Sequence, residues 1–247
     1  NKGGDDKKAL ELFDEPSWNN PVARMVDHQL KSVVNRLDGV YTLKGVVNYI
    51  VLGLEERSRP IPQYFQLLHQ SFVTESASLT FSMFCFWEGE AKLGALNGIL
   101  STEPGFVQGH EVVKVIFDPA KLSFASLIQA AKKQDCSKAI YTEEKDFSEL
   151  KKTVAEIKSM DRFRADSDPQ YYLKQTALKY VPMIPIQATK INSALAKNEN
   201  INVYLSPRQI QIWDYYKKLP SKGDSQAYNT NDFYGAWKSV MKSLKIS

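Results

Sequence analysis

The chain has 247 residues, which exceeds one typical domain of roughly 100–150 residues, so we expect one core with large additions or two small domains. Its hydrophobic (43%) and charged (24%) fractions are those of a globular protein, which argues against a disordered or fibrous chain. The net charge of +4 is spread along the sequence without a dense basic run, so no nucleic acid is expected as a partner. The most apolar stretch, residues 46–54, is far shorter than the roughly 20 residues of a membrane span, so no membrane is expected either.

The first residue is Asn1, without an initiator methionine. This start suggests a processed secreted or periplasmic protein, although a trimmed chain would begin in the same way and a cytoplasmic location stays open. The two cysteines, Cys85 and Cys136, are too few for a disulfide scaffold but could form one bridge.

Helical spacing of apolar residues dominates the N-terminal segment, residues 1–75. It predicts a helix with one apolar face over residues 22–37, a second helix over residues 43–54 and a third around residues 65–72. We therefore expect this segment to be all-helical.

The pattern changes over residues 76–160, where small polar and apolar residues first alternate as in a half-buried strand that ends at Cys85. The expected order is strand, helix, strand, strand, helix and strand, at residues 78–85, 86–97, 99–102, 112–117, 124–131 and 139–141. A further helix is expected after Thr142, with Ile157 on its apolar stripe. These residues are therefore predicted to form an α+β core.

Residues 161–247 return to helical signals. Asp168-Pro169 and Ser206-Pro207 are cap-plus-proline helix starts, and residues 233–244 carry a last amphipathic stripe. Because no repeat or low-complexity tract sets these residues apart, we expect a C-terminal helical segment packed on the core.

Cys85 carries the strongest chemical signal in the sequence. A cysteine at the start of a helix faces unpaired N–H groups and the positive end of the helix dipole, and both favour the thiolate. Cys85 is therefore a candidate nucleophile. The alternative is an inert cysteine, since free cysteines are among the most buried residues.

Cys85-Phe86-Trp87, followed by Glu90, resembles the Cys-Phe-Trp-x-x-Glu signature of the A-class peptide methionine sulfoxide reductases. The similarity continues in the same order downstream, over roughly 75 residues and about a third of the chain, through Gly98-Ile99, Ser101-Thr102, Gly105-Phe106, Gly109-His110-Glu111, Asp118-Pro119 and Ala139-Ile140-Tyr141. The resemblance implies a ferredoxin-like β-α-β-β-α-β core of this family's type over residues 76–160, with helical additions on both sides.

The resemblance also implies roles for single residues. Cys85 matches the nucleophile that attacks the sulfoxide sulfur and becomes a sulfenic acid. Phe86 and Trp87 match the aromatic pocket for the methyl group of methionine sulfoxide, and Phe106 and Glu90 are expected at the same substrate-binding site. A glutamate at the position of Glu90 more often serves structure than catalysis.

Glu111 matches the carboxyl that hydrogen-bonds the sulfoxide oxygen and donates its proton, a role that requires partial burial. The alternative is a solvated charge at the start of a strand. The substrate implied is a peptide containing methionine sulfoxide, or a small sulfoxide.

The chain departs from the family's pattern around the site. The loops after Phe106 and Asp135 are short, so the family's two sulfoxide-binding tyrosines and a supporting aspartate have no counterpart there. Losing one such preorganised donor typically costs on the order of 3 kcal/mol of transition-state stabilisation. Substitutes could come from the C-terminal segment, among Tyr171, Tyr172 and Tyr180.

The mouth of the site is also expected to be crowded and negative. Met83 and Phe84 stand where the family has glycines before the cysteine, and Glu88 replaces its glycine after the tryptophan.

Cys136 follows the second helix of the core, and in a fold of this kind that loop is expected at the same sheet edge as the end of the first strand, where Cys85 stands. We expect it to resolve a sulfenic acid on Cys85 as a disulfide, which an external thiol reductant such as thioredoxin would reduce without any cofactor. A buried cysteine and a permanent bridge remain alternatives.

A metal site is a further alternative, because soft and borderline ligands gather near this edge, namely Cys85, Cys136, His110, Glu88 and Glu111. These ligands come from separated segments without a close-spaced pair, so no metal is expected. Three classes of function stay open: a sulfoxide reductase, a thiol-disulfide protein and a non-catalytic binding protein on the same scaffold.

Overall fold

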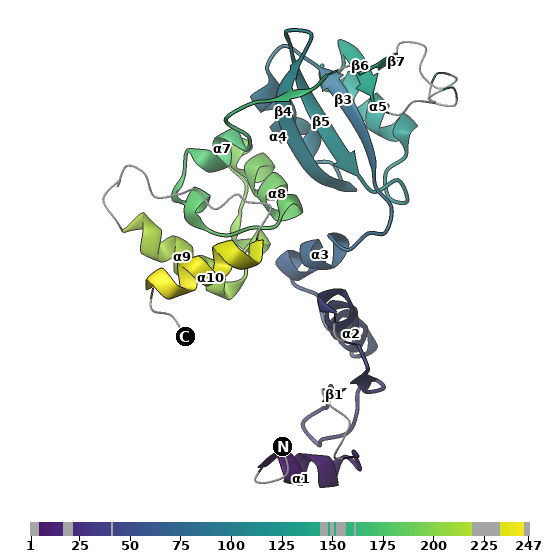
Figure 1. The fold of residues 1–247 in the computed structure, drawn as a ribbon, viewed down its shortest axis with the longest axis vertical. Coiled ribbons are helices and arrows are strands. Elements are labelled where there is room, and N and C mark those ends of the chain that lie inside the picture. The colour runs from purple at the N-terminus through teal and green to yellow at the C-terminus, as the bar shows by residue number, and fades with distance from the viewer. Residues whose placement is uncertain are drawn as a thin grey trace. The chain divides into compact units, whose positions relative to one another are not determined.

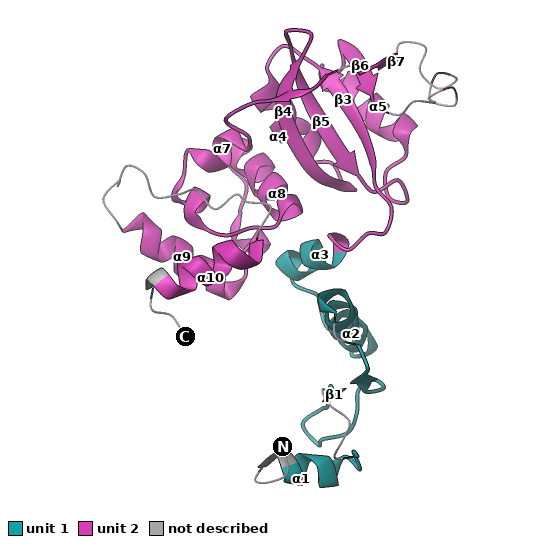
Figure 2. Cartoon of the chain, viewed as in Figure 1, with its two compact units in different colours: residues 1–69 teal, residues 70–247 magenta. Residues whose placement is uncertain are grey.

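The computed structural model describes residues 5–16, 22–40, 42–143, 148, 151, 157–160, 162–218 and 233–244. The chain forms two compact units, residues 1–69 and 70–247 (Figure 2). Among the described residues, no helix has the length and apolar composition needed to cross a membrane.

Unit 1 contains short helices and a minimal two-stranded sheet. Its elements are α1 (Asp5–Leu12), β1 (Val22–Ala23), β2 (Leu37–Asp38), α2 (Leu43–Glu56) and α3 (Gln63–Gln70), whose last residue belongs to unit 2. The Thr42 hydroxyl caps α2 by accepting the backbone N–H of Gly45 at 3.1 Å. The helices expected around residues 43–54 and 65–72 are therefore present, with slightly different ends.

The prediction of a helix over residues 22–37 is wrong. The segment instead holds β1, a turn and the start of β2, which pairs antiparallel with β1. The Asp27 carboxylate accepts the N–H groups of Gln29 and Lys31, and Leu30 has a left-handed backbone with φ of 61°. These local bonds give the backbone partners that a helix would otherwise supply, so the turn replaces the helix despite the apolar spacing.

Unit 2 is built on a six-stranded sheet in the order β7-β6-β3-β5-β4-β8. The strands are β3 (Ala77–Ser82), β4 (Ile99–Val107), β5 (His110–Phe117), β6 (Ala139–Thr142), β7 (Ile157–Ser159) and β8 (Arg164–Ala165). All neighbours are antiparallel except β6 and β7, so the sheet is mixed. The hairpin of β4 and β5 turns through Gln108 and Gly109, both with positive φ, as a tight two-residue turn requires.

Two helices lie along one face of the sheet, α4 (Phe86–Gly94) and α5 (Phe124–Lys133) (Figure 1). Side chains of one register point to this face, where Leu79 of β3 pairs with Val115 of β5 and Phe81 pairs with Val113. Leu93 of α4 and buried residues of α5 complete the same core. The predicted mixed α+β character and the order of the first six elements are thus observed.

The helix expected after Thr142 falls mainly on residues outside the described ranges. Ile157, expected on its apolar stripe, lies in β7, which pairs in parallel with β6. The prediction for this residue is wrong because the chain adds a sheet strand there.

The rest of unit 2 is helical, with α7 (Tyr171–Lys174), α8 (Pro185–Ala196), α9 (Pro207–Lys217), α10 (Phe233–Leu244) and two short 3₁₀ turns, Ala177–Tyr180 and Asn202–Tyr204. They surround a second core that contains Leu178, Ile191 and Ile212. The helix start expected at Ser206-Pro207 is present in α9, where Ser206 also forms a capping box with Gln209. At Asp168-Pro169 the helix starts later than expected, because Gln170 is the N-cap of α7.

Helix α8 packs against α4 and joins the helical part of unit 2 to the sheet. The Lys190 ammonium of α8 donates to the backbone carbonyls of Gly94 and Leu96 at 2.8 and 2.6 Å, where α4 ends. Burial lowers the pKa of Lys190 to about 8.

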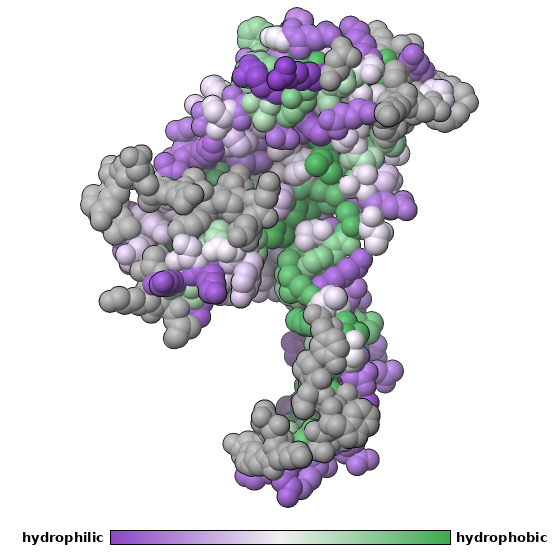
Figure 3. Space-filling view, in the orientation of Figure 1, coloured by the Kyte–Doolittle hydropathy of each residue, from purple (hydrophilic) through white to green (hydrophobic). Residues whose placement is uncertain are grey.

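The surface of the sheet is polar around the turn that joins β4 to β5. In the view of Figure 3, hydrophilic residues predominate there.

Candidate functional site

Cys85 is the N-cap of α4, with an extended backbone (φ −132°, ψ 109°) and a partly exposed side chain. Two residues separate Cys85 from the end of β3, so its thiol lies at the junction between this strand and α4, the first helix of the core. This is the strand-to-helix position predicted from the sequence. Neither cysteine of the chain is in a disulfide, and both are described.

Glu111 lies beside this helix start because β5 is the neighbour of β3 in the sheet. Its backbone carbonyl accepts the Met83 N–H at 3.2 Å, which continues the pairing of the two strands up to the turn before α4. Its carboxylate oxygen Oε2 then accepts the backbone N–H of Phe86 at 2.9 Å. A carboxylate thus occupies the N-terminus of α4, the end of a helix that favours negative charge.

The aromatic residues of the signature pack on each other next to the helix start. The buried Phe86 ring meets Phe106 edge-on, with ring centroids 5.3 Å apart, and lies 5.5 Å from the Trp87 ring. Tyr171 of α7 stacks on Trp87, with centroids 4.3 Å apart and an interplanar angle of 13°. Trp87 therefore has one ring face covered by a residue of the helical segment.

Tyr172, the next residue of α7, is influenced by the other groups of the site. Burial raises its pKa, and the negative charges of Cys85 and Glu88 raise it further. Its ring contacts that of Tyr171 edge-on at 5.4 Å. Tyr180, also considered as a substitute hydroxyl, instead contacts Tyr216 at 5.0 Å in the second core.

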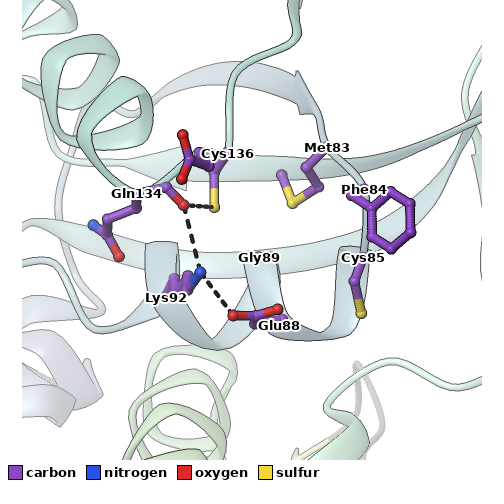
Figure 4. Close-up of a pocket in the computed structure, with 9 residues that line it drawn as sticks. Met83, Phe84, Cys85, Glu88, Gly89, Lys92, Gln134 and Cys136 are labelled. Atoms are coloured by element: carbon purple, nitrogen blue, oxygen red, sulfur yellow. Dashed lines mark hydrogen bonds and ion pairs between the residues drawn. The ribbon is translucent and has the colours of Figure 1, made fainter.

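A pocket of about 240 Å³ opens beside Cys85 (Figure 4). It is lined by residues that precede α4, by one side of α4 and by the loop after α5, namely Met83, Phe84, Cys85, Glu88, Gly89, Lys92, Gln134, Asp135 and Cys136. The Phe84 ring is 83% exposed, and the Lys138 ammonium lies 5.2 Å from its centroid. Met83, Phe84 and Glu88, which were expected at the mouth of the site, all line this pocket.

Lys92 connects the two walls of the pocket. Its ammonium pairs with the Glu88 carboxylate at 2.7 Å and donates to the Gln134 carbonyl at 3.5 Å (Figure 4). The hydrogen bond with Glu88 raises the pKa of Lys92. The expected negative charge of Glu88 at the mouth is thus matched by a cation.

Cys136 is 3% exposed, and its thiol donates to the Gln134 carbonyl at 3.3 Å. Burial raises the pKa of this thiol, and the nearby Lys92 opposes the shift. In Figure 4, Cys85 and Cys136 lie toward opposite ends of the pocket, with Met83 and Gly89 between them.

Glu90, expected at the substrate-binding site, is fully buried and does not line the pocket, and this corrects the expectation of a substrate contact. Its carboxylate faces the helical segment. Oxygen Oε2 accepts the Gln170 N–H at 2.9 Å and the Asn192 side-chain amide at 3.4 Å, and Oε1 accepts the Thr102 hydroxyl at 3.4 Å. The pKa of Glu90 is raised to about 8, because desolvation outweighs these bonds and the backbone N–H of Tyr171.

The predicted site residues thus fall into three groups. Cys85 and Cys136 share the pocket, Glu111, Phe86, Trp87 and Phe106 gather at the start of α4, and Glu90 lies within the protein. The sequence reasoning missed Lys92, Gln134 and the amides that surround Glu90. The buried Asn192 in the mainly buried α8 is the kind of signal that could have indicated such a polar cluster.

Across the part of the chain that the structure describes, no three His, Cys, Asp or Glu side chains gather in a way that could hold a metal ion. Cys85, Cys136, His110, Glu88 and Glu111 all lie in that part. In the described part of the chain, these five residues therefore do not form the ligand cluster that the metal alternative requires.

No family model matches the chain. Among curated proteins, the mitochondrial peptide methionine sulfoxide reductase of Mus musculus is 35% identical over 143 residues, covering 50% of this chain and 55% of that protein. The peptide methionine sulfoxide reductase MsrA of Granulibacter bethesdensis is 40% identical over 62 residues, covering 18% of this chain and 34% of that protein. The chain thus spans about a third to about half of the length of these relatives. In a solved structure, methionine sulfoxide reductase A of Corynebacterium diphtheriae, the similarity covers 48% of this chain and 86% of that chain, at 16% identity and a TM-score of 0.37.

Proposed function

The chain is a divergent member of the A-class peptide methionine sulfoxide reductase family, and on that premise we propose that it is a thiol-dependent oxidoreductase for methionine sulfoxide. The substrate is methionine sulfoxide in a peptide, or a small methyl sulfoxide. The observation that carries the proposal is the 2.9 Å bond from the Phe86 N–H to Glu111, which brings a carboxyl to the helix start that bears Cys85.

In the proposed reaction the sulfur of Cys85 attacks the sulfoxide sulfur. The Glu111 carboxyl donates its proton to the sulfoxide oxygen through Oε1, since Oε2 is engaged by the Phe86 N–H. Oxygen passes to Cys85, which becomes a sulfenic acid, and the substrate leaves as a thioether. The substrate sulfur is thus reduced by two electrons and the cysteine sulfur is oxidised by two.

Trp87 is proposed to bind the methyl group of the sulfoxide. Tyr171 stacks on one face of its indole, and Phe86 lies 5.5 Å from the same ring, so the indole is held in an aromatic cluster beside Cys85. Tyr172, whose ring meets that of Tyr171 edge-on at 5.4 Å, is proposed as the hydroxyl that replaces a missing family tyrosine. Phe106 of β4 packs edge-on against Phe86 and is proposed to belong to the same substrate-binding site.

Cys136 is proposed as the resolving thiol. It would attack the sulfenic acid, form the Cys85–Cys136 disulfide and release water, and a dithiol protein of the thioredoxin kind would then reduce the disulfide. Both residues line one pocket, which supports the proposal, but Met83 and Gly89 lie between them in Figure 4.

We also propose that residues 76–160 form a ferredoxin-like core that carries the chemistry, with residues 161–247 packed on it. The antiparallel order β6-β3-β5-β4, with α4 and α5 on one face, supports this assignment. The helical segment contributes Tyr171 to the site, so it serves more than stability.

The experiment is the reduction of N-acetylmethionine sulfoxide with dithiothreitol by the full chain. We expect turnover with the native protein, none with Cys85→Ser, and turnover retained with Cys136→Ser, because dithiothreitol can reduce a sulfenic acid directly. Absence of sulfoxide turnover together with a reversible Cys85–Cys136 disulfide would favour the second candidate, a thiol-disulfide protein. The shared pocket is the observation behind that alternative.

A further inference from the structure

Glu90 is a buried carboxyl that the reaction does not use. It is 0% exposed and lies five residues after Cys85 on α4, turned away from the pocket. Its partners come from β4, from α8 and from the residues that begin α7, at separations of 12 to 102 positions in the chain. Such a carboxyl can tie distant segments together.

The strongest of these contacts fix the start of α7. Oxygen Oε2 accepts the Gln170 N–H at 2.9 Å, and the neighbouring N–H of Tyr171 lowers the pKa of the carboxyl against the effect of burial. Helix α7 is four residues long, and its N-cap has no side-chain cap bond of its own. Glu90 therefore supplies from another helix the acceptor that an N-terminus needs.

Gln170 has a left-handed backbone with φ of 59°, a conformation that costs energy for a residue other than glycine. Its side-chain amide donates to the Thr102 carbonyl at 3.3 Å, so this residue is held by its backbone and its side chain. The direction in which the chain enters α7 is thus set by Glu90 and by β4.

Tyr171 follows at once, and its ring stacks on Trp87 at 4.3 Å. Trp87 and Glu90 are three residues apart on α4, which places them on neighbouring positions of one helix face. Helix α4 therefore contacts the start of α7 at two points, the Gln170 backbone through Glu90 and the Tyr171 ring through Trp87.

We propose that Glu90 is a positioning residue, which holds the first turn of α7 so that the Tyr171 ring stays on Trp87 beside Cys85. The proposal rests on the proposed function for its effect on substrate binding, because Trp87 is there the surface for the sulfoxide methyl group. Without the carboxyl, α7 loses its acceptor and the indole loses its fixed partner.

The first test compares Glu90→Ala with Glu90→Gln. The glutamine keeps one oxygen that can accept the N–H of Gln170, whereas alanine keeps none. With N-acetylmethionine sulfoxide and dithiothreitol we expect Glu90→Ala to raise KM about two- to tenfold, the loss of one aromatic stack, with kcat little changed. Glu90→Gln is expected to stay near the native KM.

The matched control is Thr102→Val, which removes the bond to the other carboxyl oxygen and leaves α7 untouched. It should leave KM unchanged. An equal rise of KM in Thr102→Val and Glu90→Ala would overturn the proposal, because the effect would then come from a general loss of stability. If Glu90→Ala does not fold, Tyr171→Ala takes its place and should show the same rise of KM.

A second readout needs no substrate and so separates this proposal from the proposed function. The fluorescence of Trp87 is obtained as the difference between each protein and its Trp87→Phe form, since the chain has four tryptophans. Acrylamide should quench this difference signal more strongly in Glu90→Ala than in the native protein and in Glu90→Gln. Equal quenching in all three would overturn the positioning role, even if sulfoxide turnover is found.

Discussion

The Phe86 backbone N–H donates to the Glu111 carboxylate at 2.9 Å, across a separation of 25 residues in the chain. The contact joins the first turn of α4 to the strand next to β3. It leaves the second carboxyl oxygen of Glu111 free of any bond within the described residues that would compete with a substrate.

Glu111→Gln tests the proton-donor role directly. The amide keeps the bond from the Phe86 N–H but cannot donate an acidic proton, so we expect kcat/KM for a methyl sulfoxide to fall by roughly 10²- to 10⁴-fold. The control is Glu103→Gln, which changes an exposed glutamate on the adjacent strand β4 and should leave kcat/KM unaltered. A loss of less than tenfold in Glu111→Gln would exclude proton donation by this residue.

The two thiols should react in a fixed order with an alkylating reagent. Cys85 is partly exposed at a helix start, whereas Cys136 is buried and burial raises its pKa. At neutral pH we expect iodoacetamide to label Cys85 first, with Cys136 labelled only slowly or after unfolding. Peptide mapping by mass spectrometry gives the order, and preferential labelling of Cys136 would contradict the structure.

Gly89→Ala tests how firmly Met83 packs on α4. A methyl group added at Gly89 would overlap the Met83 thioether, so the end of that flexible side chain must move away. We expect a loss of no more than about 1 kcal/mol in the free energy of unfolding, the lower end of the cost of overpacking. The double variant Gly89→Ala with Met83→Ala should recover part of this loss, and urea unfolding measures both. A fully stable single variant would show that Met83 is not fixed there.

The pH dependence of stability should report on Glu90. Its pKa is raised from 4.5 to about 8 in the folded chain, so the folded state holds a proton that the unfolded state has lost between these values. Stability is therefore expected to fall as pH rises from about 5 to 8. Lys174 is the charged neighbour that opposes the shift, and the lowered pKa of Lys190 acts only above about pH 8.

The measurement is the urea midpoint at pH 5 and at pH 8 for the native chain and for Glu90→Gln. The variant cannot titrate at this position, so its midpoint should change less between the two pH values. An identical change in both proteins would mean that Glu90 does not take up a proton on folding.

Much of the α/β part could be predicted from local patterns. The stripe from Phe124 to Ala131 is set by the helix face that meets the core, and a short window of sequence records that. The strand before Cys85 was correctly placed but is not half-buried, because the last four residues of β3 are buried on both faces. The same reasoning failed for residues 22–37, where side-chain bonds of Asp27 favour a turn over the helix that the apolar spacing indicated.

The site was predictable only in part for a related reason. Cys85 carries its own helix-start signal, and the family resemblance supplied Glu111. The partners of Glu90 lie as far as residue 192, and no periodic pattern in the sequence connects them. The stack of Tyr171 on Trp87 likewise depends on how α7 returns to α4, which is a property of the folded chain.

In unit 2, side chains of one helix bind backbone groups at the end of another, and this limits which fragments of the protein could fold alone. Glu90 of α4 closes the beginning of α7, and Lys190 of α8 closes the end of α4. A fragment that stopped at residue 160 would keep the buried carboxyl of Glu90 but lose the N–H donors of residues 170 and 192. It would also expose the carbonyls of residues 94 and 96, which the Lys190 ammonium now binds. The smallest autonomous piece of unit 2 is therefore expected to extend at least through α8.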